Sequence, residues 1–96
     1  MALSDVSNIT KVKSNFAIYK GNDNAIIKPS TRNGKKFMVI YDNKTTHFGD
    51  INSPDYTKTN DDSKRNAYLA RATKIKGDWK KNKYSANNLA INVLWK

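Results

Sequence analysis

Few side chains in this 96-residue sequence could carry out acid–base or metal chemistry. His47 is the only histidine, all eight acidic residues are aspartate, and there is no cysteine. A general base needs a nucleophile within hydrogen-bond reach, and a metal site needs several ligands at compatible spacing. His47 instead follows β-forming residues beside Phe48, so we expect it to hydrogen-bond a neighbouring loop. The pair Asp61-Asp62 suits the start of a helix better than a carboxylate site. These residues predict no enzyme, no metal site and no cofactor.

The sequence does supply residues that can bind anions. The formal net charge is +10 at pH 7. Lysine and arginine side chains bind nucleic-acid phosphates by releasing counterions, and aromatic side chains can stack on unpaired bases. Fifteen lysines against three arginines favour non-specific contacts, because base-specific readout prefers arginine. The candidate anion contacts are Lys64, Arg65, Arg71, Lys74, Lys76, Lys80, Lys81 and Lys83.

The same residues have a second explanation. Asn, Lys and Ile are abundant here, and all three have AT-rich codons, so part of the lysine excess can reflect base composition. Tyr68 shares a helical face with Leu69 and Ile75, which favours packing in a core over stacking on bases. We therefore expect the aromatic residues to anchor the core or an interface. These anchors are Phe48, Tyr56, Tyr68, Trp79 and Trp95.

A β-hairpin is the first element that positions these residues. Residues 37–41 and 45–48 are rich in β-branched and aromatic types. Asp42-Asn43-Lys44 lies between them, and Asp and Asn tolerate the left-handed conformations of a tight turn.

Two short helices are predicted after the hairpin. Asp61-Asp62-Ser63 offers N-cap oxygens and favourable charge for the start of the first, which runs to about Lys76 and stops at Gly77. Ser85 is the expected N-cap of the second, which runs through Leu94. Helices that follow strands in this order predict an α+β fold: a small β-hairpin or antiparallel sheet followed by two short helices.

Residues 1–34 lack a clear hydrophobic period. Short apolar pieces at 16–19 and 25–27 lie among polar residues, and the turn-forming pair Asn33-Gly34 ends this segment. One interpretation is a pair of extra short strands packed on the rest of the chain. The other is an extended N-terminal arm that lies along a partner. The predicted organisation is thus an arm or extra strands at 1–34 and a basic hairpin-helix-helix module at 35–96.

The order of short motifs after residue 34 resembles a group of small, basic, largely uncharacterised proteins of the nucleocytoplasmic large DNA viruses. Those proteins have a lysine-led strand, a hairpin that ends in His-Phe-Gly, then Asp-Tyr-Thr, a basic Tyr-Leu-Ala-Arg helix, a Trp and Leu-Trp. They usually also carry histidines after the Asp-Tyr-Thr and Leu-Ala-Arg steps, which this sequence lacks, so no metal role is carried over. The matching positions are Lys35-Lys36-Phe37, His47-Phe48-Gly49, Asp55-Tyr56-Thr57, Tyr68-Leu69-Ala70-Arg71, Trp79 and Leu94-Trp95.

The resemblance implies a viral protein but transfers no activity. We expect a non-enzymatic virion structural protein, a minor capsid component that binds larger viral capsid proteins. The alternative is a non-specific DNA-binding protein that contacts or condenses the packaged genome. Neither a signal peptide nor an apolar run near the ~20 residues of a membrane span is evident, so we expect no membrane span. The expected location is the virion, after assembly in the host cytoplasm or nucleus.

Overall fold

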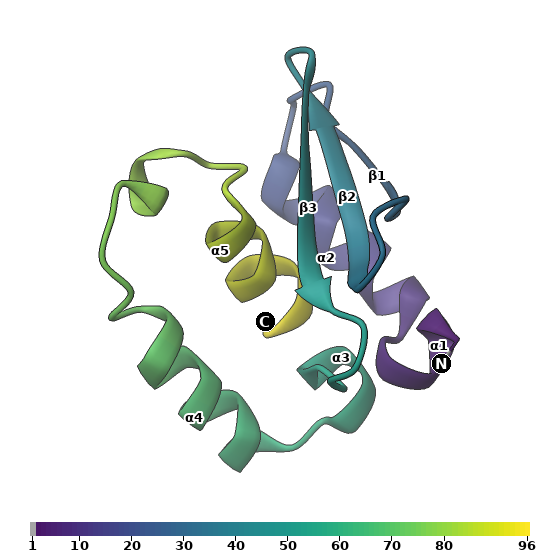
Figure 1. The fold of residues 1–96 in the computed structure, drawn as a ribbon, viewed down its shortest axis with the longest axis vertical. Coiled ribbons are helices and arrows are strands. Elements are labelled where there is room, and N and C mark those ends of the chain that lie inside the picture. Colours follow the sequence, from purple (N-terminus) through teal and green to yellow (C-terminus); the bar gives the residue numbers. More distant parts are fainter. Residues whose placement is uncertain (1) are drawn as a thin grey trace.

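The computed structural model describes residues 2–96, which form a three-stranded antiparallel sheet with helices packed against it (Figure 1). The strands lie in the order β1-β2-β3, so β2 is central. This arrangement confirms the α+β class. The elements are α1 (Leu3–Val6), α2 (Ile9–Lys20), β1 (Ile26–Pro29), β2 (Lys35–Tyr41), β3 (Lys44–Asp50), α3 (Tyr56–Thr59), α4 (Asp62–Ala72), the 3-10 turn η1 (Trp79–Lys81), α5 (Ala86–Leu89) and the π-helical η2 (Ala90–Leu94).

The hairpin forms where the sequence predicts it. Asp42 and Asn43 have φ angles of 51° and 62°, and two consecutive left-handed residues are what a two-residue type I′ turn requires. The turn sets the register of β2 against β3, which places Phe37 opposite Phe48 with ring centroids 6.1 Å apart. These two rings form one wall of the hydrophobic core.

Both predicted helix starts are confirmed, and one predicted end is wrong. The side chain of Asp61 accepts a hydrogen bond from the backbone of Lys64, and the side chain of Ser85 caps α5 in the same way. The helix that begins at Asp62 ends at Ala72, not near Lys76. Beyond Ala72 the backbone bonds change from i−4 to i−3 partners, which tightens and terminates the last turn. Gly77 therefore lies in the following loop rather than at the helix C-terminus.

Residues 2–34 are folded, so the prediction of an extended N-terminal arm is wrong. Asn8 caps α2, and Val12 and Phe16, one helical turn apart, are 0% and 3% exposed. Burial of these two side chains holds α2 against the rest of the chain. The alternative of extra strands is half correct. Ala25 is buried and β1 pairs with β2, whereas residues 16–19 lie in α2.

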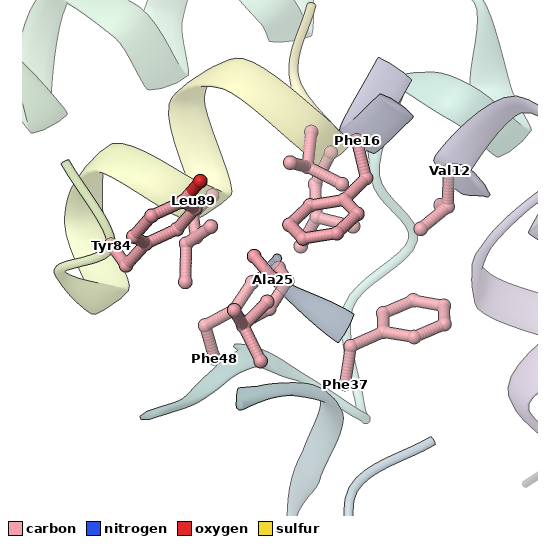
Figure 2. Packing of buried hydrophobic residues seen from close by; sticks show 11 residues of the cluster. Val12, Phe16, Ala25, Phe37, Phe48, Tyr84 and Leu89 are labelled. Carbon is pink, nitrogen blue, oxygen red and sulfur yellow. The ribbon is translucent and has the colours of Figure 1, made fainter. Parts of the chain in front are cut away.

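One hydrophobic core unites the N-terminal and C-terminal parts of the chain (Figure 2). The inner face of the sheet packs against α2, α5 and η2. Tyr84 is at the centre of an aromatic group, because its ring lies 4.7 Å from Tyr41 and 6.5 Å from Phe16. Among residues 2–96, no helix has the length and apolar character needed to cross a membrane. The core residues are Val12, Phe16, Ala25, Phe37, Val39, Phe48, Tyr84, Leu89, Ala90, Val93 and Leu94.

Candidate functional site

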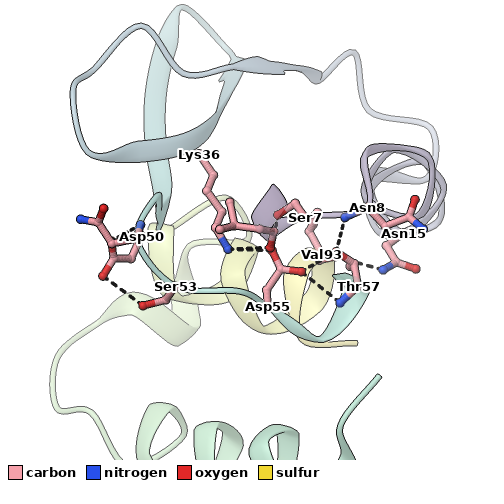
Figure 3. A network of polar contacts seen from close by, with 11 residues as sticks. Ser7, Asn8, Asn15, Lys36, Asp50, Ser53, Asp55, Thr57 and Val93 are labelled. Atoms are coloured by element: carbon pink, nitrogen blue, oxygen red, sulfur yellow. Dashed lines mark hydrogen bonds and ion pairs between the residues drawn. The ribbon is translucent and has the colours of Figure 1, made fainter. Parts of the chain in front are cut away.

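A buried ion pair lies at the base of the hairpin (Figure 3). Asp55 is 0% exposed and Lys36 is 3% exposed, and 2.9 Å separates the Lys36 Nζ from the Asp55 Oδ2. Ser7 Oγ also donates to Oδ2, while the backbone N–H and Oγ1 of Thr57 donate to Oδ1. Lys36 donates a second hydrogen bond to the carbonyl of Val6. A charge buried in this way costs several kcal/mol unless it is paired and hydrogen-bonded, and here both conditions are met.

This network holds distant segments together. Ser7 lies between α1 and α2, Lys36 belongs to β2, and Asp55 is the N-cap of α3. The Asp55 backbone N–H donates to Val6, and the backbone N–H of Asn8 donates to Thr57 Oγ1. In the described part of the chain, every buried side-chain nitrogen and oxygen has a partner. The network therefore positions the surrounding elements.

The glycine of the His-Phe-Gly motif has a packing role. Gly49 has a φ of +83°, and a Cβ at this position would lie 2.9 Å from Leu94 Cδ1 and 3.1 Å from Lys36 Cβ. The preceding Phe48 is buried in the core. His47 Nδ1 lies 2.7 Å from Ser30 Oγ in the loop after β1, which confirms the predicted loop contact. Gly49 also lines a cavity between α4 and the base of the hairpin.

The predicted aromatic anchors occupy three different environments. Phe48 belongs to the core cluster, and Tyr68 and Trp95 pack against its edge. The rings of Tyr68 and Trp95 are stacked, with centroids 4.3 Å apart and planes 8° apart. Tyr56 and Trp79 are half-buried outside the core cluster. Tyr56 donates to an Asp62 carboxylate oxygen at 2.7 Å, and Trp79 Nε1 donates to a backbone carbonyl at 2.6 Å.

Three of the eight predicted anion contacts have partners inside the chain. Arg65 Nε donates to the Trp95 carbonyl at 2.8 Å, which attaches α4 to the end of the chain. Lys83 pairs with Asp23 at 2.9 Å, and Lys80 lies over the ring of Trp79. The other five are exposed, and no ion pair forms at any of them within residues 2–96; they are Lys64, Arg71, Lys74, Lys76 and Lys81.

Two cavities each have several basic residues in their lining. The first, of about 480 Å³, lies between α4 and the base of the hairpin; its lining includes Lys35, Asp50, Lys64, Tyr68, Arg71 and Trp95. We call it the α4 groove. The second, of about 400 Å³, lies near the hairpin turn; its lining includes Asp23, Tyr41, Lys44, Lys81, Lys83 and Tyr84. We call it the turn cavity.

The two cavities differ in how their charges are satisfied. In the turn cavity, Asp23 accepts hydrogen bonds from Lys83 and Tyr84, which lower the pKa of its carboxyl group. Burial, followed by the hydrogen bond to Asp23, raises the pKa of Tyr84. In the α4 groove, burial raises the pKa of Tyr68, and the positive charge of Arg71 opposes that rise. The turn cavity thus already has an internal anion, whereas Arg71 in the α4 groove has no carboxylate within ion-pair distance in the described residues.

One family model matches this chain. It is described as a family of unknown function (DUF5754), and it covers residues 25–72, half of the sequence. The chain belongs to the DUF5754 family. Among curated proteins and among solved structures, none matches it.

The residues that the DUF5754 model matches correspond to a defined part of the fold. It begins at the buried Ala25, contains the whole sheet and the Lys36–Asp55 pair, and ends at Ala72, the last residue of α4. The DUF5754 range also supplies every charged residue of the α4 groove, while the turn cavity takes lysines from beyond residue 72. The α4 groove is therefore the candidate functional site.

Sequence reasoning found part of this site. It identified Lys64, Tyr68, Arg71 and Trp95, which the structure brings together in the α4 groove. It missed Lys35, because Lys35 lies on β2 and the other exposed cations of the groove lie on α4. The spacing of residues within one helix does not predict a contact with a strand. It also missed the buried charges of Lys36 and Asp55, because charged residues are ordinarily exposed.

Proposed function

We propose that this chain is a non-enzymatic protein of a large double-stranded DNA virus, and that it binds the phosphate backbone of nucleic acid without reading its sequence. The observation that supports this most directly is the amount of unneutralised positive charge. Of 18 lysine and arginine side chains, only Lys36 and Lys83 form an ion pair with a carboxylate in residues 2–96. Exposed cations gain binding free energy from counterion release wherever they reach phosphates.

The placement of these cations supports the same function. Lys64 and Arg71 lie on α4, Lys74 and Lys76 lie in the loop after it, and Lys81 lies in η1. This part of the chain, drawn in green, arcs around one side of the molecule (Figure 1). The molecule measures 34 × 30 × 25 Å, and duplex DNA carries about one phosphate charge per 1.7 Å of its axis. Several phosphates are thus within the span of this arc.

A salt series on random-sequence duplex DNA tests the proposal. We expect the logarithm of the affinity to fall linearly with the logarithm of the salt concentration, with a slope of about −0.9 per phosphate contacted. The double variant Lys74→Ala/Lys76→Ala should make that slope shallower by up to about 1.8, which corresponds to the loss of two phosphate contacts. The matched control is Lys13→Ala/Lys28→Ala, which removes the same charge from exposed positions on α2 and β1.

Two outcomes would contradict the proposal. The first is an affinity no higher than that of an unrelated protein of equal net charge. The second is an equal change in the salt slope for the two double variants, because binding would then depend on the total charge and not on the cations between α4 and η1.

A second candidate function is that of a minor capsid component that binds larger capsid proteins in the virion. The outer face of the sheet favours it. Ile26 is 52% exposed on β1, its cross-strand partner Ile40 is half-exposed, and Met38 on the same face is half-exposed too. Exposed apolar residues that adjoin one another are typical of protein interfaces.

Ile26→Asp should then reduce incorporation into particles without weakening DNA binding. Normal incorporation of this variant would contradict the capsid function.

A further inference from the structure

The α4 groove is formed by one face of a helix and the base of a hairpin. Lys64, Ala67, Tyr68 and Arg71 follow the i, i+3, i+4, i+7 spacing, which brings side chains to the same face of a helix. Lys35 lines the groove from the start of β2. Four basic residues from two elements therefore line one cavity: Lys36, which is paired with Asp55, and the exposed Lys35, Lys64 and Arg71. Its volume of about 480 Å³ is within the range of about 300–1,000 Å³ that is usual for small-molecule sites.

The negative charge in the groove is limited. Among the described residues that line the groove, Asp50 is the one with a carboxylate, and it forms no ion pair. The Asp50 carboxylate accepts hydrogen bonds from the Asn52 backbone and the Ser53 hydroxyl, which direct it toward its own loop. The balance of charge therefore favours an anionic ligand.

The groove also contains an aromatic surface. Tyr68 and Trp95 stack on each other, and both are half-buried residues that line the groove. The stack is fixed at both ends: Tyr68 belongs to α4, and the backbone carbonyl of Trp95 accepts from Arg65. A fixed aromatic pair beside cations can receive a flat ring and the phosphate attached to it.

We infer that the α4 groove binds one nucleotide of a single-stranded nucleic acid. The phosphate contacts Lys35, Lys64 and Arg71, and the base packs on the Tyr68–Trp95 stack. A duplex is excluded from this contact, because its bases are stacked on one another and cannot enter a cavity. This inference rests on the proposed function and adds a preference to it: the chain binds unpaired strands more tightly than duplex.

Fluorescence anisotropy with two labelled probes tests the inference. One probe is an oligothymidine of about a dozen nucleotides, and the other is a random duplex of the same length. Tyr68→Leu keeps apolar bulk against Trp95 but removes the ring. We expect it to weaken oligothymidine binding about 10-fold and to leave duplex binding within about 2-fold. The matched control is Tyr19→Leu, the same change at a tyrosine that lines neither cavity. Circular dichroism and thermal melting check that each variant is folded.

A charge variant provides a second test that does not depend on the core. Lys35→Ala alters an exposed side chain, and we expect it to weaken oligothymidine binding more than Lys13→Ala does, although both remove one charge. Equal affinity of the unaltered chain for the two probes, or no effect of Tyr68→Leu and Lys35→Ala, would overturn the inference and leave backbone binding intact. Failure to bind either probe better than a protein of equal charge would instead overturn the proposed function.

Discussion

Replacement of Asp55 by asparagine tests the role assigned to the buried network. The two carboxylate oxygens of Asp55 receive hydrogen from Lys36 and Ser7 on one side and twice from Thr57 on the other. An asparagine amide has nearly the same shape, but one of its two ends is a donor. Whichever way it turns, a donor would face donors, and the Lys36 ammonium would be buried without a counterion.

The expected cost is large relative to the stability of the chain. Removal of one partner from a buried ion pair typically costs about 3–5 kcal/mol. Native proteins have a free energy of unfolding of about 0.05–0.15 kcal/mol per residue, which gives about 5–14 kcal/mol for a domain of this size. Asp55→Asn should therefore remove about a fifth or more of the free energy of unfolding.

Urea unfolding followed by tryptophan fluorescence measures this loss. The control is Asp42→Asn, which makes the same chemical change at an exposed turn residue with positive φ, where asparagine is equally suited. The double variant Lys36→Met/Asp55→Asn should recover part of the loss, because no charge is then left buried. A loss below about 1 kcal/mol for Asp55→Asn, or no recovery in the double variant, would refute the reasoning.

Three further changes have distinct expected outcomes. Gly49→Ala should lower the free energy of unfolding by about 1–3 kcal/mol in urea titration, because its φ is +83° and the new Cβ would approach Leu94 within 2.9 Å. Asp61→Ala should cost about 0.5–2 kcal/mol through the lost N-cap and should reduce helical circular dichroism. The folded-state pKa of Tyr84 lies above the ordinary value of 10.0, so the unfolded chain loses this proton first and stability falls as pH rises past 10. Tyr84→Phe should flatten that fall in urea titrations across alkaline pH, and an unchanged profile would contradict the rise in pKa attributed to the burial of Tyr84 and to its hydrogen bond with Asp23.

The parts of the fold that the sequence predicted are those specified by local residues. Asp42-Asn43 determine the hairpin turn because few residue types accept two successive left-handed conformations. Asp61 and Ser85 mark helix starts because a short polar side chain can satisfy the free N–H groups of a first turn. These signals act over three or four residues and need no knowledge of the tertiary fold.

The missed parts depend on contacts between distant segments. The helix α2 has only Val12 and Phe16 buried along 12 residues, which gives too weak a period to distinguish a helix from a polar arm. Its N-cap, Asn8, was the available signal. The burial of Lys36 and Asp55 could not be read from the residues beside each in the sequence. Asp55 needs Lys36 and Ser7, and Lys36 needs Asp55 and the Val6 carbonyl, and these partners all lie far away in the chain. For the same reason, the sequence predicted only part of the α4 groove. Lys35 of β2 is brought next to α4 only by the tertiary fold.

The network around Asp55 also has a consequence for folding kinetics. Ser7 and Asp55 are 48 residues apart in the chain, so their contact, which joins the end of α1 to the start of α3, closes a long loop. Such contacts are expected to form after the rate-limiting step. Substitutions at Ser7 should therefore speed unfolding and change the folding rate little, which a chevron plot would show directly. The polar network would then set how long the native state persists, while the local hairpin and helix caps set how quickly it is reached.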